Sequence, residues 1–98
     1  MSTQPLNVEM FSDKLDHEFV VEEDDVPAIR LRLREAKATR NVSNAPRAPF
    51  SLLFTSEGDL VLPQRMYALR HPVLGLHVIF LVPIAKAGGE VTYEAIFN

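Results

Sequence analysis

The sequence predicts a mainly β domain: a small antiparallel β-barrel or sandwich of about six or seven strands with a short N-terminal helix. Three observations lead to this fold class. Residues 28–35 alternate between apolar and charged side chains, short apolar runs separated by turn residues follow, and helical spacing occurs only near the N-terminus. Period-two alternation is typical of a strand with one buried face. The 98 residues are expected to form one domain, residues 1–98.

The first third of the chain predicts a helix and a β-hairpin. Val8, Phe11 and Leu15 recur at helical spacing, which indicates one or two amphipathic turns. Residues 18–22 form a short strand, and the polar turn that follows joins it to the strand at 28–35. The alternation in the second strand places one set of side chains inward and the other outward. The inward set is Ile29, Leu31 and Leu33, and the outward set is Arg30, Arg32 and Arg34.

The remainder of the chain predicts a loop and four more strands. Residues 37–49 mix small and polar residues with two prolines, so we expect the longest and most mobile loop there. Residues 50–55 are nearly all apolar, which favours a strand buried on both faces or central in the sheet. Further strands are expected at 65–70, 76–82 and 90–97.

The last two strands are predicted to form a hairpin around a turn at residues 85–89. Counting outward from that turn brings Phe80 opposite Tyr93. The flanking pairs would be Val82 with Val91 and Val78 with Ala95. All six side chains would then point to the core, because register fixes the face on which each residue lies.

Composition excludes several kinds of chemistry. There is no cysteine, so neither a disulfide nor a thiolate metal site can form. The net charge of −3 disfavours nucleic acid, whose binding depends on basic side chains. The N-terminus lacks a secretory pattern, and the longest apolar run is far shorter than the ~20 residues that cross a bilayer. We therefore expect a cytoplasmic protein without nucleic-acid or membrane partners.

His71 and His77 flank a turn at residues 72–75 and are candidate site residues, together with Tyr67. Zinc sites use closely spaced histidine pairs such as His-x-His or His-Glu-x-x-His, and neither spacing is present. We therefore expect both histidines to be structural, with His71 bonded to the turn backbone and His77 on a half-exposed face. No catalytic, cofactor-binding or metal-ligating residue is predicted.

The arginine row Arg30, Arg32 and Arg34 is a second candidate site. It could bind an anion or RNA, or its guanidinium groups could pair across strands with Glu18 and Glu22. The second interpretation is favoured. The acidic run at residues 22–25 lacks the Asp-x-Asp-x-Asp-Gly spacing of a calcium loop and is expected to be a solvated turn.

Five motifs in order resemble one family of small bacterial proteins. They are Phe-Ser-Leu-Leu-Phe, Leu-Pro-Gln-x-x-Tyr, His-Pro-x-Leu-Gly, Phe-Leu-Val-Pro and Tyr-Glu-Ala-x-Phe-Asn. The likeness is close over residues 50–98 and loose over 6–35. The family is grouped as a domain of unknown function, so the resemblance implies no activity and no catalytic residues. It also suggests an accessory role in a phage-tail-like or other bacterial assembly.

Two functions follow as hypotheses. The first is a non-enzymatic interaction or assembly module that contacts a protein partner, or a second copy, through a sheet face or edge. The C-terminal strand is a candidate for such an edge. The alternative is a small-ligand-binding barrel or minor enzyme with an aromatic-lined pocket. The aromatic residues concerned are Phe50, Phe54, Tyr67, Phe80 and Tyr93.

Overall fold

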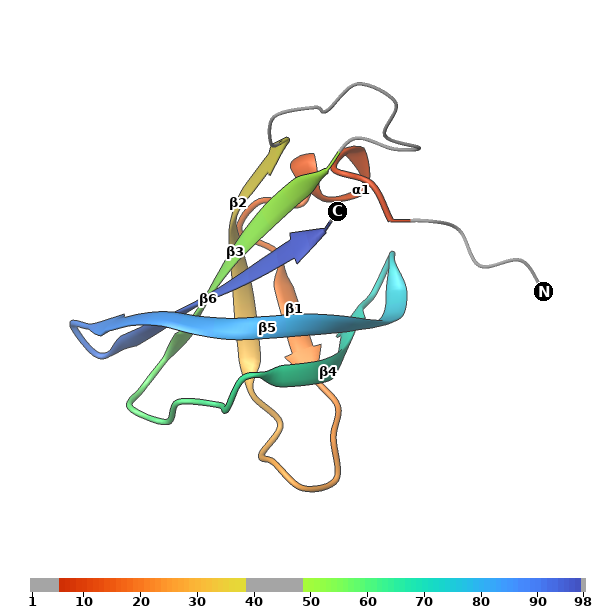
Figure 1. Cartoon of the computed structure of the whole chain (residues 1–98). Helices are drawn as coiled ribbons and strands as arrows, with labels where there is room; N and C mark the ends of the chain where they lie inside the picture. Colours follow the sequence, from red (N-terminus) through yellow and green to blue (C-terminus); the bar gives the residue numbers. More distant parts are fainter. Residues whose placement is uncertain (1–5, 39–48, 98) are drawn as a thin grey trace.

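The computed structural model describes residues 6–38 and 49–97, which form six strands and one short helix (Figure 1). The elements, in chain order, are α1 (Glu9–Ser12), β1 (Glu18–Val21), β2 (Arg30–Ala38), β3 (Phe50–Glu57), β4 (Arg65–His71), β5 (Gly75–Ala87) and β6 (Glu90–Phe97). The predicted loop at 37–49 begins later than expected, because β2 continues to Ala38. Its central part, residues 39–48, lies outside the described residues.

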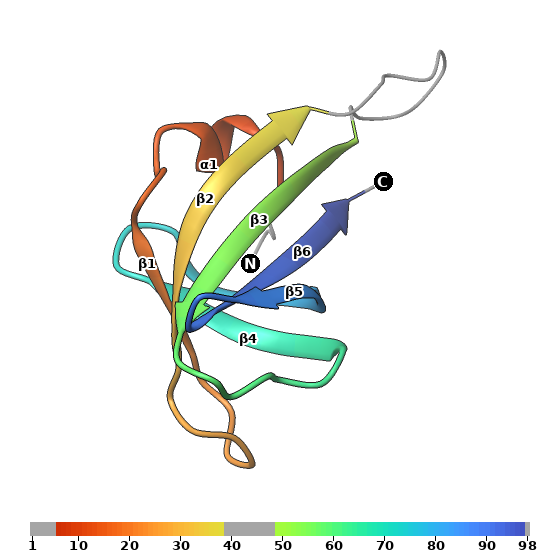
Figure 2. The same ribbon diagram turned by 90° about the vertical axis from the view of Figure 1, so that its left-hand side faces the viewer.

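The strands close into an antiparallel barrel in the order β1-β2-β3-β6-β5-β4, with β4 returning to β1 (Figure 2). This confirms the predicted mainly β class and decides between barrel and sandwich. Closure leaves β6 between β3 and β5. The C-terminal strand is therefore not a free sheet edge, and the hypothesis that it pairs with another copy there is not supported.

Strand alternation builds the core as the sequence predicts for β2 and β3. Leu31 and Leu33 are buried while the arginines between them are exposed. On β3, Phe50 and Phe54 are buried, but Leu53 on the outer face is only half-buried. The first half of β3 therefore has one buried face rather than two, as in other antiparallel sheets with a solvated side.

α1 covers one end of the barrel (Figure 1). Its buried residue Phe11 brings its ring to within 6.2 Å of the Phe19 ring and 6.1 Å of the Phe50 ring, measured between centroids. The predicted helix is confirmed but shorter than the apolar spacing suggested. Because it ends at Ser12, Leu15 is left on the surface. A helix this short depends on tertiary contacts, here those of Phe11, for its stability.

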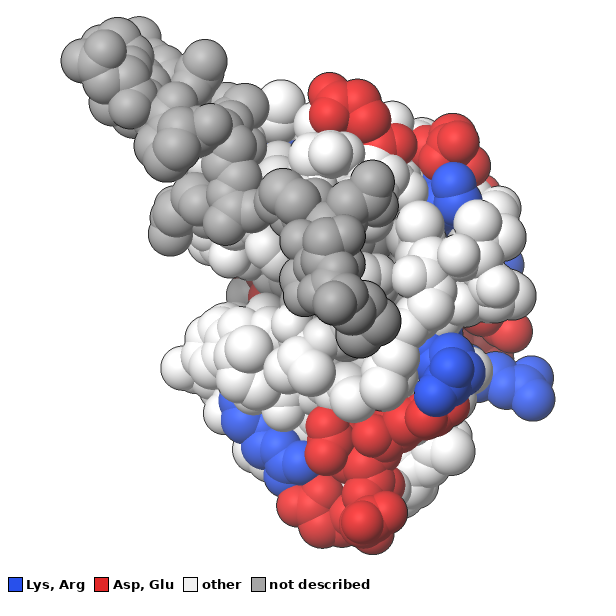
Figure 3. Space-filling view, turned by 90° about the vertical axis from the view of Figure 1, so that its right-hand side faces the viewer, with Lys and Arg blue, Asp and Glu red and all other residues white. Residues whose placement is uncertain are grey.

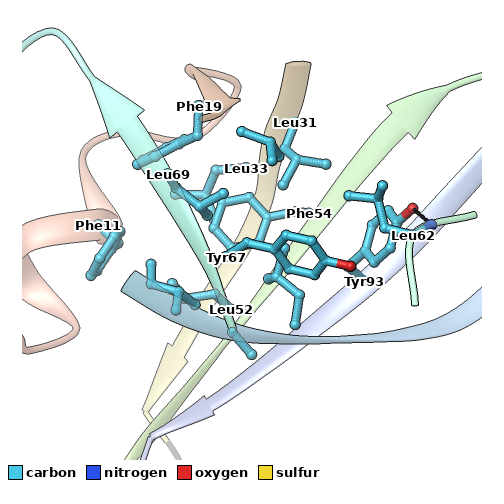
Figure 4. Packing of buried hydrophobic residues seen from close by; sticks show 14 of the residues in the cluster. Phe11, Phe19, Leu31, Leu33, Leu52, Phe54, Leu62, Tyr67, Leu69 and Tyr93 are labelled. Carbon is cyan, nitrogen blue, oxygen red and sulfur yellow. Dashed lines mark hydrogen bonds between the residues drawn. The ribbon is translucent and has the colours of Figure 1, made fainter. Parts of the chain in front are cut away.

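Two tyrosine hydroxyls anchor the connection between β3 and β4 to the core (Figure 4). The Leu62 amide donates to the Tyr93 hydroxyl at 2.9 Å, and both residues are buried. The Tyr67 hydroxyl donates to the Pro63 carbonyl. The Tyr67 ring is also buried, and this burial raises the pKa of its hydroxyl above the usual value. Among the described residues, every buried side-chain nitrogen or oxygen has a hydrogen-bond partner.

The predicted register of the last hairpin is wrong. The turn consists of Gly88 and Gly89 alone, both with positive φ, as a two-residue hairpin turn requires. Ala87 therefore pairs with Glu90, and β5 extends past Pro83 to Ala87. A bulge between Pro83 and Ala85 shifts the register further, so that Pro83, and not Phe80, lies opposite Tyr93.

The two other predicted pairings also change with this register. Val82 lies opposite Glu94, and Lys86 opposite Val91. The displacement is four residues next to the turn and three beyond the bulge, and the odd number there turns Phe80 and Val78 to the outside of the barrel. The inner face of β5 instead carries Ile79 and Leu81, both buried. The six side chains predicted to share the core face do not do so.

Candidate functional site

The outer surface of the barrel has two contrasting faces. The outward side chains of β2 are charged, whereas those of β4 and β5, which pair with each other, are mostly apolar. In Figure 3, which faces the end of the β4–β5 hairpin, uncharged surface lies near the centre, and charged side chains lie below it and along the upper and right-hand rims. Each face contains sequence-predicted candidate residues.

The arginine row lines a shallow hollow of about 170 Å³ on the charged face. Its walls combine three guanidinium groups with three carboxylates and one hydroxyl: Arg30, Arg32, Arg34, Glu18, Glu57, Glu90 and Thr55. Arg32 lies 3.8 Å from Glu18, which confirms one of the two predicted cross-strand pairs. Glu22 instead pairs with Arg70 on β4, so the second predicted pair is wrong.

Arg34 is the most extensively bonded member of the row. Its Nε donates to the Thr55 hydroxyl at 3.1 Å, and its two terminal nitrogens lie 3.1 Å from Asp16 and 3.6 Å from Glu90. Within the row, Arg32 and Arg34 are thus paired with nearby carboxylates. A free anion entering the hollow would meet three negative charges as well as three positive ones. The arrangement is that of an exposed ion-pair network rather than a built anion site.

The acidic run at residues 22–25 is not merely a solvated turn, because three of its carboxylates bind groups on β4. The Glu23 carboxylate accepts the Ala68 amide at 2.7 Å, and Arg65 binds Asp25 through two hydrogen bonds of 2.6 and 2.9 Å. The Arg65 guanidinium holds the pKa of the Asp25 carboxyl below its usual value, and Arg70 does the same for Glu22. These bonds tie the β1–β2 loop to β4.

His71 lies buried at the end of β4, and its Nδ1 accepts the amides of Val73 at 3.0 Å and Leu74 at 3.1 Å. This confirms that His71 is bonded to the turn backbone. Its ring also lies 4.7 Å from the Phe19 ring, between centroids. Burial, and then the nearby His17 and Lys14, lower the pKa of His71 below its usual value.

The contact that sequence reasoning missed is between His71 and His17. His17 Nδ1 lies 3.0 Å from His71 Nε2, and the two ring planes are within 5° of each other. Backbone bonds hold His17 in place, because its carbonyl accepts the Leu33 amide and the adjacent Asp16 amide donates to the Leu33 carbonyl. Fifty-four residues separate the two histidines, so no local spacing could have revealed the pair.

His77 lies on the same hairpin. Its Nε2 donates to the Leu74 carbonyl at 2.8 Å, and the residue is half-buried, as predicted. All three histidines of the sequence therefore lie around one turn. Among the residues that the structure describes, no group of three or more His, Asp or Glu side chains is arranged to hold a metal ion.

The predicted aromatic residues do not gather around a pocket. Phe50, Phe54, Tyr67 and Tyr93 are fully buried and pack in the core. Phe80 lies outside the barrel. The aromatic rings on the inside fill the barrel as core side chains, which small barrels need for stability.

Four exposed apolar side chains and the half-buried Ala68 between them form what we call the outer apolar face. It comprises Met66, Ala68, Leu76, Val78 and Phe80. Met66 pairs with Phe80 and Ala68 with Val78 across β4 and β5, so the side chains are direct neighbours. The exposed fractions are 51% for Met66, 48% for Leu76, 59% for Val78 and 42% for Phe80. The sequence indicated this face only indirectly, because residues 76–82 are apolar on both faces of the strand except at His77.

Together these features define a small closed β-barrel domain with a filled core, a charged face and an apolar face. The chain belongs to the family described as "Domain of unknown function (DUF6916)", whose model matches residues 6–97. This confirms the family type that the sequence motifs suggested. No curated protein and no solved structure matches the chain. None of the helices in the described part of the chain is long and apolar enough to span a membrane.

Proposed function

We propose that this domain is a non-enzymatic assembly module that associates with a second copy of itself through the outer apolar face. The observation that carries the proposal is the pattern of β5. A strand in an antiparallel sheet with one solvated face alternates between apolar and polar residues. In β5 both faces are apolar: Ile79 and Leu81 point inward, while Val78 and Phe80 are exposed. Such a strand is expected where both of its faces become covered.

The charge distribution supports an apolar protein surface as the occupant. Arg65 and Arg70 border the face on β4, and carboxylates of the β1–β2 loop bind both of them. The face itself carries no charged side chain at its centre, where Val78 lies opposite Ala68. A nucleic acid or an anionic surface would find no unneutralised positive charge there.

A second copy fits this face because the face is self-complementary. In a two-fold symmetric contact the same patch meets itself, so a charged centre would place like charges together. An uncharged centre avoids that cost. Two such faces would pack as two sheets do in a sandwich, about 10 Å apart. Because the barrel is closed, this association uses a face and does not require a free strand edge.

The size of the face predicts a weak dimer. Covering the exposed half of each large side chain is worth roughly 1 kcal/mol, and each counts twice in a symmetric dimer. Association costs at least about 4 kcal/mol in lost rotational and translational freedom. The four large side chains then supply about 8 kcal/mol, which leaves about 4 kcal/mol, so the expected dissociation constant is on the order of 1 mM for the isolated domain. Contacts of this strength suit a subunit held at high local concentration in a larger assembly.

Sedimentation analysis from about 10 μM to about 1 mM tests this proposal. The weight-average mass should rise with concentration from the 11.0 kDa monomer toward twice that value. Val78→Lys should keep the protein monomeric at all concentrations, since the side chain is exposed and the fold does not need it. Leu60→Lys is the matched control, because Leu60 is also an exposed apolar residue but lies in the β3–β4 connection.

Two results would contradict self-association through this face. One is a wild-type protein that remains monomeric throughout, which would leave a different protein as the occupant. The other is equal dimerisation of Val78→Lys and Leu60→Lys, which would move the contact elsewhere on the barrel.

A further inference from the structure

We propose that His17 and His71 form an acid-sensitive latch: protonation releases the β4–β5 turn from the segment after α1 while the rest of the barrel stays folded. This device is independent of the outer apolar face. It rests on the positions of hydrogen-bond donors around the two rings.

The hydrogen bonds of His71 leave its Nδ1 without a proton. Two backbone N–H groups, of Val73 and Leu74, point at that nitrogen from 3.0 and 3.1 Å. A neutral imidazole carries one proton, so it must be on Nε2 of His71. That proton is then donated to Nδ1 of His17, 3.0 Å away, which must accept it. The pair therefore requires both rings to be neutral.

Either ring loses a bond when it is protonated. A proton on Nδ1 of His71 would face the two amide donors of the turn, so the turn would have to move away. A proton on Nδ1 of His17 would face the Nε2 proton of His71, so the two rings would separate. Opening thus takes up a proton at each ring. Histidine is the side chain whose ordinary pKa, about 6.5, makes this possible near neutral pH.

The groups around His17 and His71 make the bonded pair more sensitive to protonation. From the segment after α1, Lys14 faces the pair with a positive charge, and Asp13 binds the ammonium group of Lys14 at 2.6 Å. From β1 the neighbour of His71 is the uncharged Phe19 ring. From β5, His77 reaches the same turn through the Leu74 carbonyl. No carboxylate among the described residues is bonded to either latch histidine, so the cation finds no compensating partner there.

His77 should not respond as the latch does. It donates from Nε2 to a carbonyl, and a protonated ring still carries that proton. Acid therefore breaks the bonds on one side of the turn and leaves the bond to His77 intact. The opened turn remains attached through β5, with the exposed Val73 at its tip.

Amide hydrogen exchange of Val73 and Leu74 between pH 7.5 and pH 5 tests the latch. Protection factors, which correct for the pH dependence of intrinsic exchange, are compared with that of Leu62, whose amide is bonded to the buried Tyr93 hydroxyl. Below about pH 6.5, protection at the turn should fall by up to about tenfold per pH unit for each proton taken up, hence up to about a hundredfold for the pair. Protection of Leu62 should change by less than about twofold.

Three variants separate the latch from a merely structural role. His71→Asn keeps an oxygen that can accept the amide two residues on, as in an Asx-turn, but cannot be protonated in this range, so turn protection should become independent of pH. His17→Gln keeps an acceptor but removes one titrating ring, so the pH dependence should fall to that of one proton. His77→Gln should retain the wild-type profile.

Each outcome decides the proposal. It is overturned if wild-type protection at Val73 and Leu74 follows that of Leu62 down to pH 5. An unchanged two-proton profile in His17→Gln also overturns it. Should His71→Asn fail to fold, the wild-type and His17→Gln profiles still settle the question.

Discussion

Replacing Tyr93 with phenylalanine removes one hydroxyl from the core and tests how the β3–β4 connection is held. The ring and its packing remain, but the Leu62 amide loses its acceptor (Figure 4). Both residues are buried, so water cannot take the place of the hydroxyl. A buried donor left without a partner costs about 1–3 kcal/mol of unfolding free energy.

Tyr67→Phe is the matched comparison. Its hydroxyl donates to the Pro63 carbonyl, and Pro63 is exposed, so water can replace the lost donor. A carbonyl with a missing donor is also tolerated better than a buried amide with no acceptor. The expected loss is about 0.5–1.5 kcal/mol, less than for Tyr93→Phe.

Urea unfolding followed by circular dichroism measures both losses, provided that the denaturant slopes of the two variants match that of the wild type. A smaller loss for Tyr93→Phe than for Tyr67→Phe, or no measurable destabilisation of either variant, would contradict this expectation. Either result would mean that the Leu62 amide is not held by the Tyr93 hydroxyl in solution.

Three further outcomes are expected. Phe54→Ala should cost about 3–5 kcal/mol by leaving a cavity in the core, whereas Phe80→Ala should cost under about 1 kcal/mol; comparable losses in urea melts would contradict the observed register. Gly88→Ala should cost roughly 1–2 kcal/mol through its φ of 63° alone, because an added Cβ meets nothing within 4 Å; a neutral result would argue against the two-glycine turn. The Arg65 guanidinium lowers the folded-state pKa of Asp25 from its usual 3.8, so the contribution of this carboxylate to stability is present above pH 3.8. That contribution is lost as the pH falls through the lowered pKa. The melting temperatures of Asp25→Asn and wild type should therefore differ at neutral pH and converge in acid.

The sequence predicted the buried face correctly for strands in which only one face is apolar. In β2, charges at every second position allow a single orientation, so Leu31 and Leu33 had to face the core. β5 has apolar side chains on both faces, and either set would have made a plausible core. The register of its hairpin was therefore set by the length of the turn and the bulge near Pro83, which the pattern does not reveal.

For the candidate sites too, the sequence predicted local contacts but not contacts between distant segments. The bond from His71 to its own turn is local, and its position beside Pro72 indicated it. The contact between His71 and His17, and that between Asp25 and Arg65, depend on which strands become neighbours in the closed barrel. A single sequence offers many carboxylates for each arginine, and only the topology selects among them. The outer apolar face was present in the sequence, but as an ambiguity in β5 rather than as a motif.

The most direct test of the assembly proposal is an isotope-filtered NOE experiment on an equal mixture of labelled and unlabelled protein at about 1 mM, where the dimer should be populated. The proposal predicts intermolecular NOEs that connect the methyl groups of Val78 and Met66 with the ring of Phe80 in the other copy. No intermolecular NOE, or NOEs confined to the arginine row on β2, would contradict it.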